Sequence, residues 1–222
     1  MPYIKLFRED NARKEFFEHS EYLAMREALP AFLKPVLAFA YFTGSRRGEI
    51  LSLKWEQVDL LSAVVRLEVG TTKNKQGRII PLAPALLEIL KMHRQKTLQE
   101  FPLCAVVFHR DGETIERFNK EWNAAAKAAG FVDGKGKPTK LFHDNRRSAI
   151  RNLVRAGIPE DVSMKISGHR TRSIFSRYNV STESDIRQGA ARLGEYLKAM
   201  EEQAAKQDPH TIGTLAASSP IM

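Results

Sequence analysis

Residues 140–178, KLFHDNRRSAIRNLVRAGIPEDVSMKISGHRTRSIFSRY, are the most informative stretch of this chain. The stretch holds nine Lys or Arg against three Asp or Glu, so most of the net charge of +9 of the chain is local to it. Its apolar periodicity predicts two helices, over residues 144–156 and 159–167. Gly168 then stands where a glycine commonly ends a helix. We therefore expect a strongly basic pair of helices.

The phase of the first helix places one arginine among apolar side chains. An advance of about 100° per residue from Arg146 puts Ile150 at about 40°, whereas Arg151 and Arg155 fall outside the apolar arc. His143, if helical, also points inward. A guanidinium on the core side needs an anionic partner, because an unpaired buried charge is costly. That partner is either an internal carboxylate or a substrate phosphate, which guanidinium donors bind through two hydrogen bonds.

The segment TGSRRGEI at residues 43–50 repeats this pattern. In a helix over residues 46–53, Arg46 shares a face with Ile50, while Arg47 points aside. Glu49 is three residues further on, where it can bond and orient Arg46. Taken alone, an inward arginine is more often structural than functional. Two of them in a basic chain favour a binding site for an anion.

The composition is that of a globular domain with excess positive charge. The chain has 222 residues, 43% hydrophobic and 27% charged, enough for one substantial core and a small appendage. A pI near 9.7 favours a polyanionic partner, nucleic acid before membrane, although charge alone fits a merely basic protein equally well. The single Cys104 excludes an internal disulfide and a cysteine metal cluster. Without a signal peptide or an apolar run of about 18 residues, the pattern favours a cytoplasmic protein.

The predicted architecture is α+β and mostly α-helical. Residues 63–69 and 78–82 are β-like and flank a polar turn, so a small antiparallel β-sheet is expected near residues 62–82. A short strand is expected at 105–108. From residue 181 onward, Ile186, Leu193, Leu197 and Met200 form one stripe of a final amphipathic helix. The other helices are predicted at 15–28, 32–44, 46–53, 85–98 and 114–129.

Five short motifs occur in a fixed order along the chain. They are TGSRRGE at 43–49, TKNK at 72–75 followed by RIIPL at 78–82, HDNR at 143–146, SGH at 167–169, and Tyr178. In this order and spacing they resemble the signature of the tyrosine recombinase, or phage integrase, family, over about residues 30–180. No single motif is specific, but the ordered set is.

The resemblance implies a tyrosine-recombinase-like catalytic domain. It also implies a site-specific DNA recombinase or integrase that cleaves and rejoins strands through a 3′-phosphotyrosyl intermediate, for integration or excision of a phage or mobile element. Residues at the family's catalytic positions are Tyr178 as nucleophile, Arg46 and Arg146 as phosphate clamp, His169 as a third phosphate donor, His143 as general acid–base, and Lys73 as general acid. Glu49 matches a supporting position, and Lys75 competes with Lys73 for its role.

The resemblance also predicts the partners. Double-stranded DNA is the expected ligand, with contacts from Arg47, Lys75, Arg147, Arg170 and Arg172. We expect no metal and no cofactor, because transesterification keeps the phosphodiester energy in the protein–DNA link. A homo-oligomer is expected, a tetramer on DNA and a monomer when free, without membrane association. The expected location is the bacterial cytoplasm, at the nucleoid.

Two departures from the family pattern concern Asn145 and the domain organisation. Asn145 stands where the family usually has an apolar residue, but its phase lies at the edge of the apolar arc, so the change is expected to be tolerated; Ser45 is a similar, minor change. Residues 1–180 are expected to form the catalytic domain, with the N-terminal core-binding domain absent. Residues 181–203 are expected to form a helix that docks onto a neighbouring protomer or packs on its own core, and residues 204–222 a disordered tail.

Two other functions fit parts of the pattern. A type IB topoisomerase shares the chemistry but relaxes DNA alone, and the spacing from SGH to Tyr178 together with the terminal helix favours the recombinase. A non-catalytic DNA-binding regulator would keep the fold with a vestigial site, but every catalytic position is filled. The recombinase is therefore the preferred hypothesis.

Overall fold

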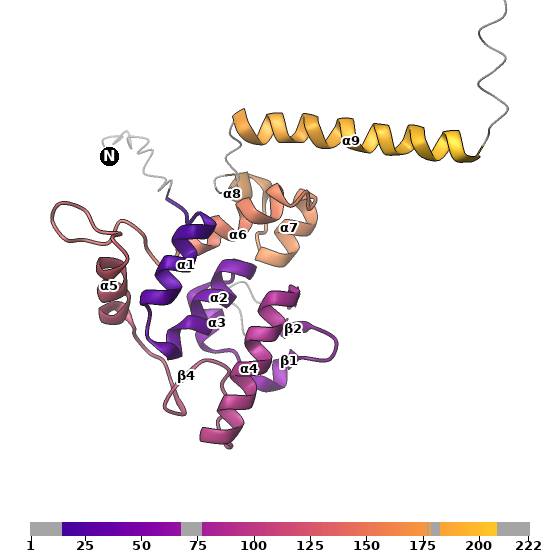
Figure 1. The fold of residues 1–222 in the computed structure, drawn as a ribbon. Coiled ribbons are helices and arrows are strands. Elements are labelled where there is room, and N and C mark those ends of the chain that lie inside the picture. The colour runs from indigo at the N-terminus through magenta and orange to yellow at the C-terminus, as the bar shows by residue number, and fades with distance from the viewer. Residues whose placement is uncertain (1–14, 68–76, 177, 179–182, 208–222) are drawn as a thin grey trace, which may run out of the picture. The chain divides into compact units, whose positions relative to one another are not determined.

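The computed structural model describes residues 15–67, 77–176, 178 and 183–207 (Figure 1). The chain divides into two compact units, residues 1–180 and 181–222. The predicted α+β, mostly helical class is confirmed. No helix in the described ranges combines the length and the apolar character that a membrane span requires.

The apolar helix α2, Lys34–Thr43, is the centre of the first unit. It is buried along most of its length, because nearly every residue after Lys34 is apolar, and Gly44 ends it with a φ of 65°. Four helices pack on α2: α1 His19–Ala28, α3 Arg47–Leu51, α4 Pro84–Glu100 and α6 Asp144–Arg155. The remaining helices of this unit are η1 Ala31–Leu33, η2 Trp55–Gln57, α5 Asn119–Ala128, α7 Glu160–Ser167 and α8 Arg172–Ser176.

The antiparallel sheet predicted near residues 62–82 is confirmed, and a further strand before that range, which was not predicted, makes it three-stranded. Its strands are β1 Val58–Asp59, β2 Val64–Leu67 and β3 Arg78–Pro81, in the order β1-β2-β3. Val65 and Leu67 are buried and Arg66 between them is exposed, as expected for a strand with one face on the core. Val65 is paired with Ile80 of β3, which is also buried. The register therefore brings β3 onto the helical core.

The strand predicted at 105–108 is wrong. Residues 105–108 contribute only an isolated bridge between Lys54 and Val106, and the second sheet is formed by β4 His109–Arg110 and β5 Glu113–Thr114. Val107 and Phe108 are both fully buried, so consecutive side chains face the core. This does not match the two-residue alternation of a strand with one buried face. The helix predicted from residue 114 begins only at Asn119, because Thr114 belongs to β5.

The second unit contains α9, Glu183–Gln207. It carries the predicted apolar stripe, and Ile186, Leu193, Leu197 and Met200 are each 47–68% exposed. The helix continues beyond residue 203, where it was expected to end, up to Gln207. Residues 208–222 of the expected tail lie outside the described residues.

Candidate active site

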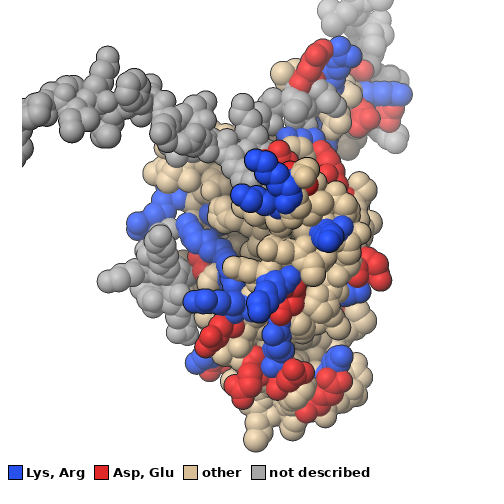
Figure 2. Space-filling model, turned by 90° about the vertical axis from the view of Figure 1, so that its left-hand side faces the viewer, with Lys and Arg blue, Asp and Glu red and all other residues tan. Residues whose placement is uncertain are grey.

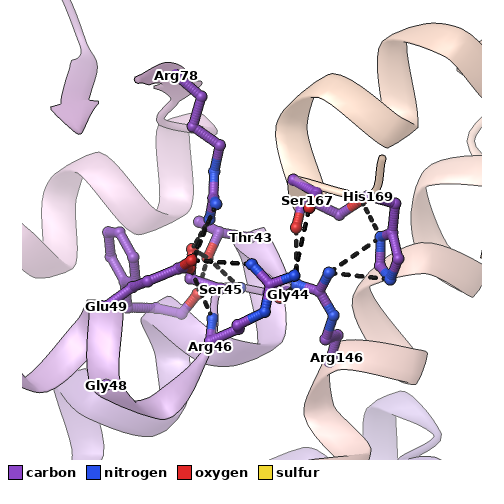
Figure 3. A network of polar contacts seen from close by, with 12 residues as sticks. Thr43, Gly44, Ser45, Arg46, Gly48, Glu49, Arg78, Arg146, Ser167 and His169 are labelled. Carbon is purple, nitrogen blue, oxygen red and sulfur yellow. Dashed lines mark hydrogen bonds and ion pairs between the residues drawn. The ribbon is translucent and has the colours of Figure 1, made fainter. Parts of the chain in front are cut away.

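Arg146 is a buried member of the polar network in Figure 3. It projects from α6 and is 3% exposed, so the inward direction predicted from the helix phase is confirmed. Its Nη1 donates to two backbone carbonyls, those of Gly44 at 2.5 Å and Ser167 at 2.6 Å. Its Nη2 lies 2.9 Å from Nε2 of His169. Burial, and then the charge of Arg46, lower the pKa of Arg146. Neutral groups hold this guanidinium in place.

Glu49 joins two arginines at the start of α3. Its Oε2 accepts the backbone N–H of Arg46 at 3.0 Å, and its Oε1 accepts Nη1 of Arg46 at 3.0 Å. Arg78 of β3 binds both carboxylate oxygens, with Nη2 2.8 Å from Oε2 and Nη1 3.2 Å from Oε1. Burial acts to raise the pKa of Glu49, but the hydrogen bonds and charge of Arg78, and then those of Arg46, hold it below its usual range. Glu49 is therefore ionised and paired with Arg46.

Arg46 reaches the site by a route that differs from the predicted one. It was expected inside a helix over residues 46–53, but α3 is Arg47–Leu51, and Arg46 precedes it with extended φ and ψ of −72° and 147°. The bond from its backbone N–H to Glu49 holds this conformation. Its side chain is 29% exposed, so Arg46 is more accessible to a ligand than Arg146 is.

His169 completes the network directly after α7. Gly168 ends α7 with a φ of 70°, and His169, 8% exposed, faces Arg146 (Figure 3). Nδ1 of His169 lies 2.8 Å from Oγ of Ser167, whose hydroxyl donates to the carbonyl of Ser163 at 2.7 Å. Ser167 therefore accepts from Nδ1–H, which leaves Nε2 as the acceptor for Arg146. Burial, and then the charge of Arg146, lower the pKa of His169 to about 3, so the ring is neutral at pH 7.

Tyr178 lies beside this network. The centre of its ring is 5.0 Å from that of His169 and 6.5 Å from that of His143. The guanidinium carbons of Arg146 and Arg147 lie 6.0 Å and 5.3 Å from the same ring centre. His143 immediately precedes α6, and partial desolvation, followed by the charge of Arg146, lowers its pKa. Two imidazoles and two guanidinium groups therefore lie around the phenol of Tyr178.

A known family model matches most of the chain. The family model described as the phage integrase family matches residues 7–185 of the 222. The chain belongs to this family. The resemblance inferred from the five motifs is thereby confirmed.

The relatives of this phage integrase family member include integrases and recombinases. It is 26% identical over 185 residues to the integrase of Salmonella phage P22, with 80% of this chain and 46% of the phage protein covered. It is also 26% identical over 190 residues to a XerC-like tyrosine recombinase of Caldanaerobacter subterraneus, with 72% and 48% covered. The chain thus spans about half the length of these curated relatives.

Solved structures of recombinases share the fold of this family member. The crystal structure of XerA recombinase aligns with a TM-score of 0.65 at 19% identity, covering 80% of this chain and 64% of the other. A lambda integrase dimer bound to a COC′ core site aligns with a TM-score of 0.60 at 21% identity, covering 75% and 48%. These likenesses confirm the predicted tyrosine-recombinase-like fold.

The other predicted DNA-binding arginines of this family member are held differently. Arg47 lies over the ring of Phe118, 4.3 Å from its centre, and donates to Oδ1 of Asn119 at 3.3 Å. Arg170 and Arg172 are exposed after the end of α7. Their side chains are exposed to solvent, whereas that of Arg47 is held by these contacts.

Basic side chains are spread across the middle of the face in Figure 2, and acidic side chains gather toward its lower end.

The predicted turn lysines, Lys73 and Lys75, lie outside the described residues. Within the part of the chain that is described, no three His, Cys, Asp or Glu side chains are grouped closely enough to bind a metal ion.

Arg78 is the site residue that sequence reasoning missed. No role was predicted for it beyond its place in the RIIPL motif, yet it shares Glu49 with Arg46. The signal was present as a two-residue alternation, since Arg78 is followed by buried Ile80 and Leu82 on the same face. A strand phase count would have identified it as a further inward arginine.

Two predictions about α6 need correction. Arg151, predicted outside the apolar arc, is 8% exposed, and its guanidinium lies 3.8 Å from the centre of the Phe16 ring. Asn145, predicted at the edge of the arc, is 1% exposed. Its Nδ2 donates to the carbonyl of Phe142 at 2.8 Å, and its Oδ1 has no partner among the described residues. Both differences arise because α6 is covered on more sides than the width of its apolar stripe indicates.

Proposed function

We propose that this chain is the catalytic part of a site-specific DNA recombinase or integrase that cleaves and rejoins strands through a 3′-phosphotyrosyl intermediate. The convergence of Tyr178 with His169, His143 and Arg146 is the observation that carries the proposal. The relatives named as phage integrase and recombinase support a role in the integration or excision of a phage or mobile element.

The proposed reaction is a pair of transesterifications at phosphorus. Oη of Tyr178 attacks the phosphorus, its proton passes to a base, and the bond to the 5′-oxygen breaks. That oxygen takes up a proton and leaves as a hydroxyl, while the 3′-phosphate stays joined to Tyr178. Attack by the 5′-hydroxyl of a second strand reverses these steps and frees the tyrosine. Bonds and charges balance without a nucleotide, a metal or a redox partner.

Two arginines stabilise the charge that develops on the phosphate in this scheme. Nη1 of Arg146 is committed to the carbonyls of Gly44 and Ser167, so Nη2, which also donates to Nε2 of His169, is the amino group that a phosphate oxygen would meet. Arg46 is less buried, and its Nη2 makes only a long contact of 3.5 Å with the carbonyl of Gly168 among the described residues. A preorganised pair of guanidinium groups of this kind stabilises a transition state without reorganisation at the moment of reaction.

The two histidines have different tasks in the proposal. His143 lies near the Tyr178 ring with a lowered pKa, so its neutral form is available as a base for the phenol proton. We assign His169 to the phosphate oxygens. In the DNA-free chain its Nε2 accepts from Arg146, so it becomes a donor only on gaining a proton, which an adjacent phosphate would favour by raising its pKa.

Lys73 is the proposed general acid for the departing 5′-oxygen. Its support is the register of the TKNK motif before β3, and Lys75 remains the competing candidate. A lysine ammonium is a mobile donor on a long stem, which suits protonation of a leaving group. The proposed DNA contacts come from Arg47, Lys75, Arg147, Arg170 and Arg172.

We further propose a tetramer on DNA and a monomer in free solution. The support is α9, whose apolar stripe is exposed along the helix and suits docking onto a neighbouring protomer. In this proposal residues 1–180 are the catalytic domain and the stripe from residue 181 to 203 is the docking segment. A DNA-cleaving role places the protein at the bacterial nucleoid, in the cytoplasm.

The test is the trapping of a covalent protein–DNA adduct. The protein is incubated in EDTA with a pool of nicked duplexes that have a randomised centre, in which cleavage releases a short fragment and prevents rejoining. We expect an SDS-resistant adduct that Tyr178→Phe abolishes. Tyr22→Phe, which removes a buried hydroxyl elsewhere, is the matched control and is expected to keep the adduct.

The sequences recovered from the adduct decide between the alternatives. Enrichment of one site supports the recombinase, whereas adducts on every sequence would favour a topoisomerase. Sequence-selective binding without any adduct would favour a regulator and refute catalysis.

A further inference from the structure

Arg78 is a deeply placed cation that the reaction scheme does not use. It opens β3 opposite Leu67 of β2, and Ile80, two residues on, is fully buried, so Arg78 lies on the core face of the sheet. Its side chain is 11% exposed. A charge in this position is stable only with a well-matched partner. The partner is Glu49, which Arg78 binds through both amino groups.

Arg78 also contacts the turn that carries His169. Gly168 precedes His169, and a Cβ added to Gly168 would lie 2.9 Å from Cζ of Arg78. Nη2 of Arg78 donates to Oγ of Ser45 at 3.2 Å. The guanidinium is therefore close both to the segment that ends in Arg46 and to the turn after α7. One side chain of the sheet thus touches both phosphate-binding segments.

The charges explain why Glu49 needs this second arginine. A carboxylate paired with Arg46 alone would neutralise it and compete with a DNA phosphate for the same donors. With Arg78 bound to both oxygens of Glu49, the three groups carry one net positive charge. The bonds from Glu49 to the backbone N–H and Nη1 of Arg46 still orient that side chain. Arg46 is then held in position without losing its attraction for phosphate.

We propose that Arg78 is a positioning residue that balances the charge of Glu49, so that Arg46 can bind the scissile phosphate, and that braces the turn at Gly168. It acts through Glu49 and Gly168 and does not itself touch DNA. This inference rests on the proposed function, because it assigns Arg46 to the phosphate.

The first test compares Arg78→Gln with Arg66→Gln. Arg66 belongs to the same sheet, points outward, is 56% exposed, and pairs with Asp59, so it is a matched control. Single-turnover cleavage is measured at saturating protein, below the unfolding temperature of each variant. We expect Arg78→Gln to lower the rate constant at least about tenfold relative to Arg66→Gln. Equal rates would overturn the proposal. Arg78→Lys serves if the glutamine variant does not fold. It keeps the cation but loses the paired contacts of the two amino groups with Glu49, so it is expected to cleave DNA more slowly than Arg66→Gln.

The second test removes the carboxylate as well. In the Arg78→Gln background, Glu49→Gln restores the net charge of the group, so we expect the double variant to cleave at least about threefold faster than Arg78→Gln alone. A merely structural role predicts the opposite, because each change would remove further hydrogen bonds. A double variant that cleaves more slowly than Arg78→Gln alone would therefore refute the charge-balancing role of Arg78.

A binding measurement keeps this inference separate from the proposed catalysis. In the Tyr178→Phe background, duplex DNA affinity is measured against salt concentration. Loss of one effective phosphate contact should reduce the slope of log K against log salt by about 0.9 in Arg78→Gln, and leave it unchanged in Arg66→Gln. A wild-type chain that binds DNA without cleaving it would refute the proposed function, while the slope would still decide the role of Arg78. An unchanged slope in Arg78→Gln would refute the proposed role of Arg78.

Discussion

Nη2 of Arg146 and Nε2 of His169 are 2.9 Å apart, and this contact requires the imidazole to be neutral. Burial, and then the charge of Arg146, lowers the pKa of His169. The same pair lies against Tyr178, so the protonation state of His169 affects both the stability of the chain and the proposed chemistry.

The low pKa of His169 predicts a loss of stability in acid. In the folded chain this pKa is about 3, below the usual 6.5, so the unfolded chain binds more protons between these values. The contribution of His169 is fully present above about pH 7 and falls by about 1.4 kcal/mol per pH unit below 6.5. Urea unfolding at pH 7 and pH 5 should therefore show a smaller acid loss for His169→Gln than for the wild type. Equal losses would contradict the assignment.

The two clamp arginines should differ in what they contribute to folding. Arg146→Ala removes a buried side chain and leaves the carbonyls of Gly44 and Ser167 without their donor, so a loss of about 2–4 kcal/mol is expected. Arg46→Ala should cost about 1 kcal/mol or less, because Arg46 is partly exposed and Glu49 keeps Arg78. Adduct formation should drop at least about 100-fold in both variants. Urea unfolding and adduct yield measure the two effects, and equal stability losses would argue against the different burial of the two side chains.

Asn145→Leu should stabilise the chain by about 1 kcal/mol. The substitution removes a buried Oδ1 that has no partner among the described residues. The carbonyl of Phe142, which loses the Asn145 side-chain donor, still accepts the backbone N–H of residue 145 at 3.2 Å. Urea unfolding is the measurement. A decrease in stability would contradict the view that the buried Oδ1 is a cost to folding.

Gly168→Ala should reduce cleavage by displacing Arg78. Gly168 has a φ of 70°, and the added methyl group would overlap the Arg78 guanidinium. Because the overlapping atoms are at the end of a flexible side chain, we expect a stability loss of about 1–2 kcal/mol rather than unfolding. Gly130→Ala, which has a φ of 79° and where a Cβ meets nothing within 4 Å, is the control for stability. A cleavage rate equal to that of the wild type in Gly168→Ala would show that cleavage does not depend on the position of the Arg78 guanidinium.

Substitutions in the stripe of α9 should affect assembly and not folding. Leu193→Asp and Leu197→Asp change side chains that are 59% and 50% exposed, so the unfolding free energy is expected to change by about 0.5 kcal/mol or less. If the stripe docks onto a neighbouring protomer, both variants should lose higher-order complexes on DNA while the monomer keeps its affinity. Native gels and light scattering on DNA measure this, and unaltered complexes would exclude the docking role of the stripe.

The elements could be predicted from the sequence because they depend on local periodicity. The α6 and α7 helices, the β2 and β3 strands and the stripe of α9 lie close to the predicted ranges. The inward direction of Arg146 was predictable for the same reason, since neighbours on one helix face are fixed by 3.6 residues per turn. The ordered motifs likewise indicated the family.

What only the tertiary structure decided was which side chains share a partner. Glu49, Arg78 and Gly168 meet because β3 packs on α7, and α6 reaches Gly44 because it packs on α2. The burial of Asn145 and Arg151 follows from the same long-range packing, whereas the extended backbone of Arg46 is held locally by Glu49, three residues on. A periodic pattern records which face of an element is covered, but not by which distant segment. Contacts across 29 and 102 residues of sequence therefore appear only when the chain is folded.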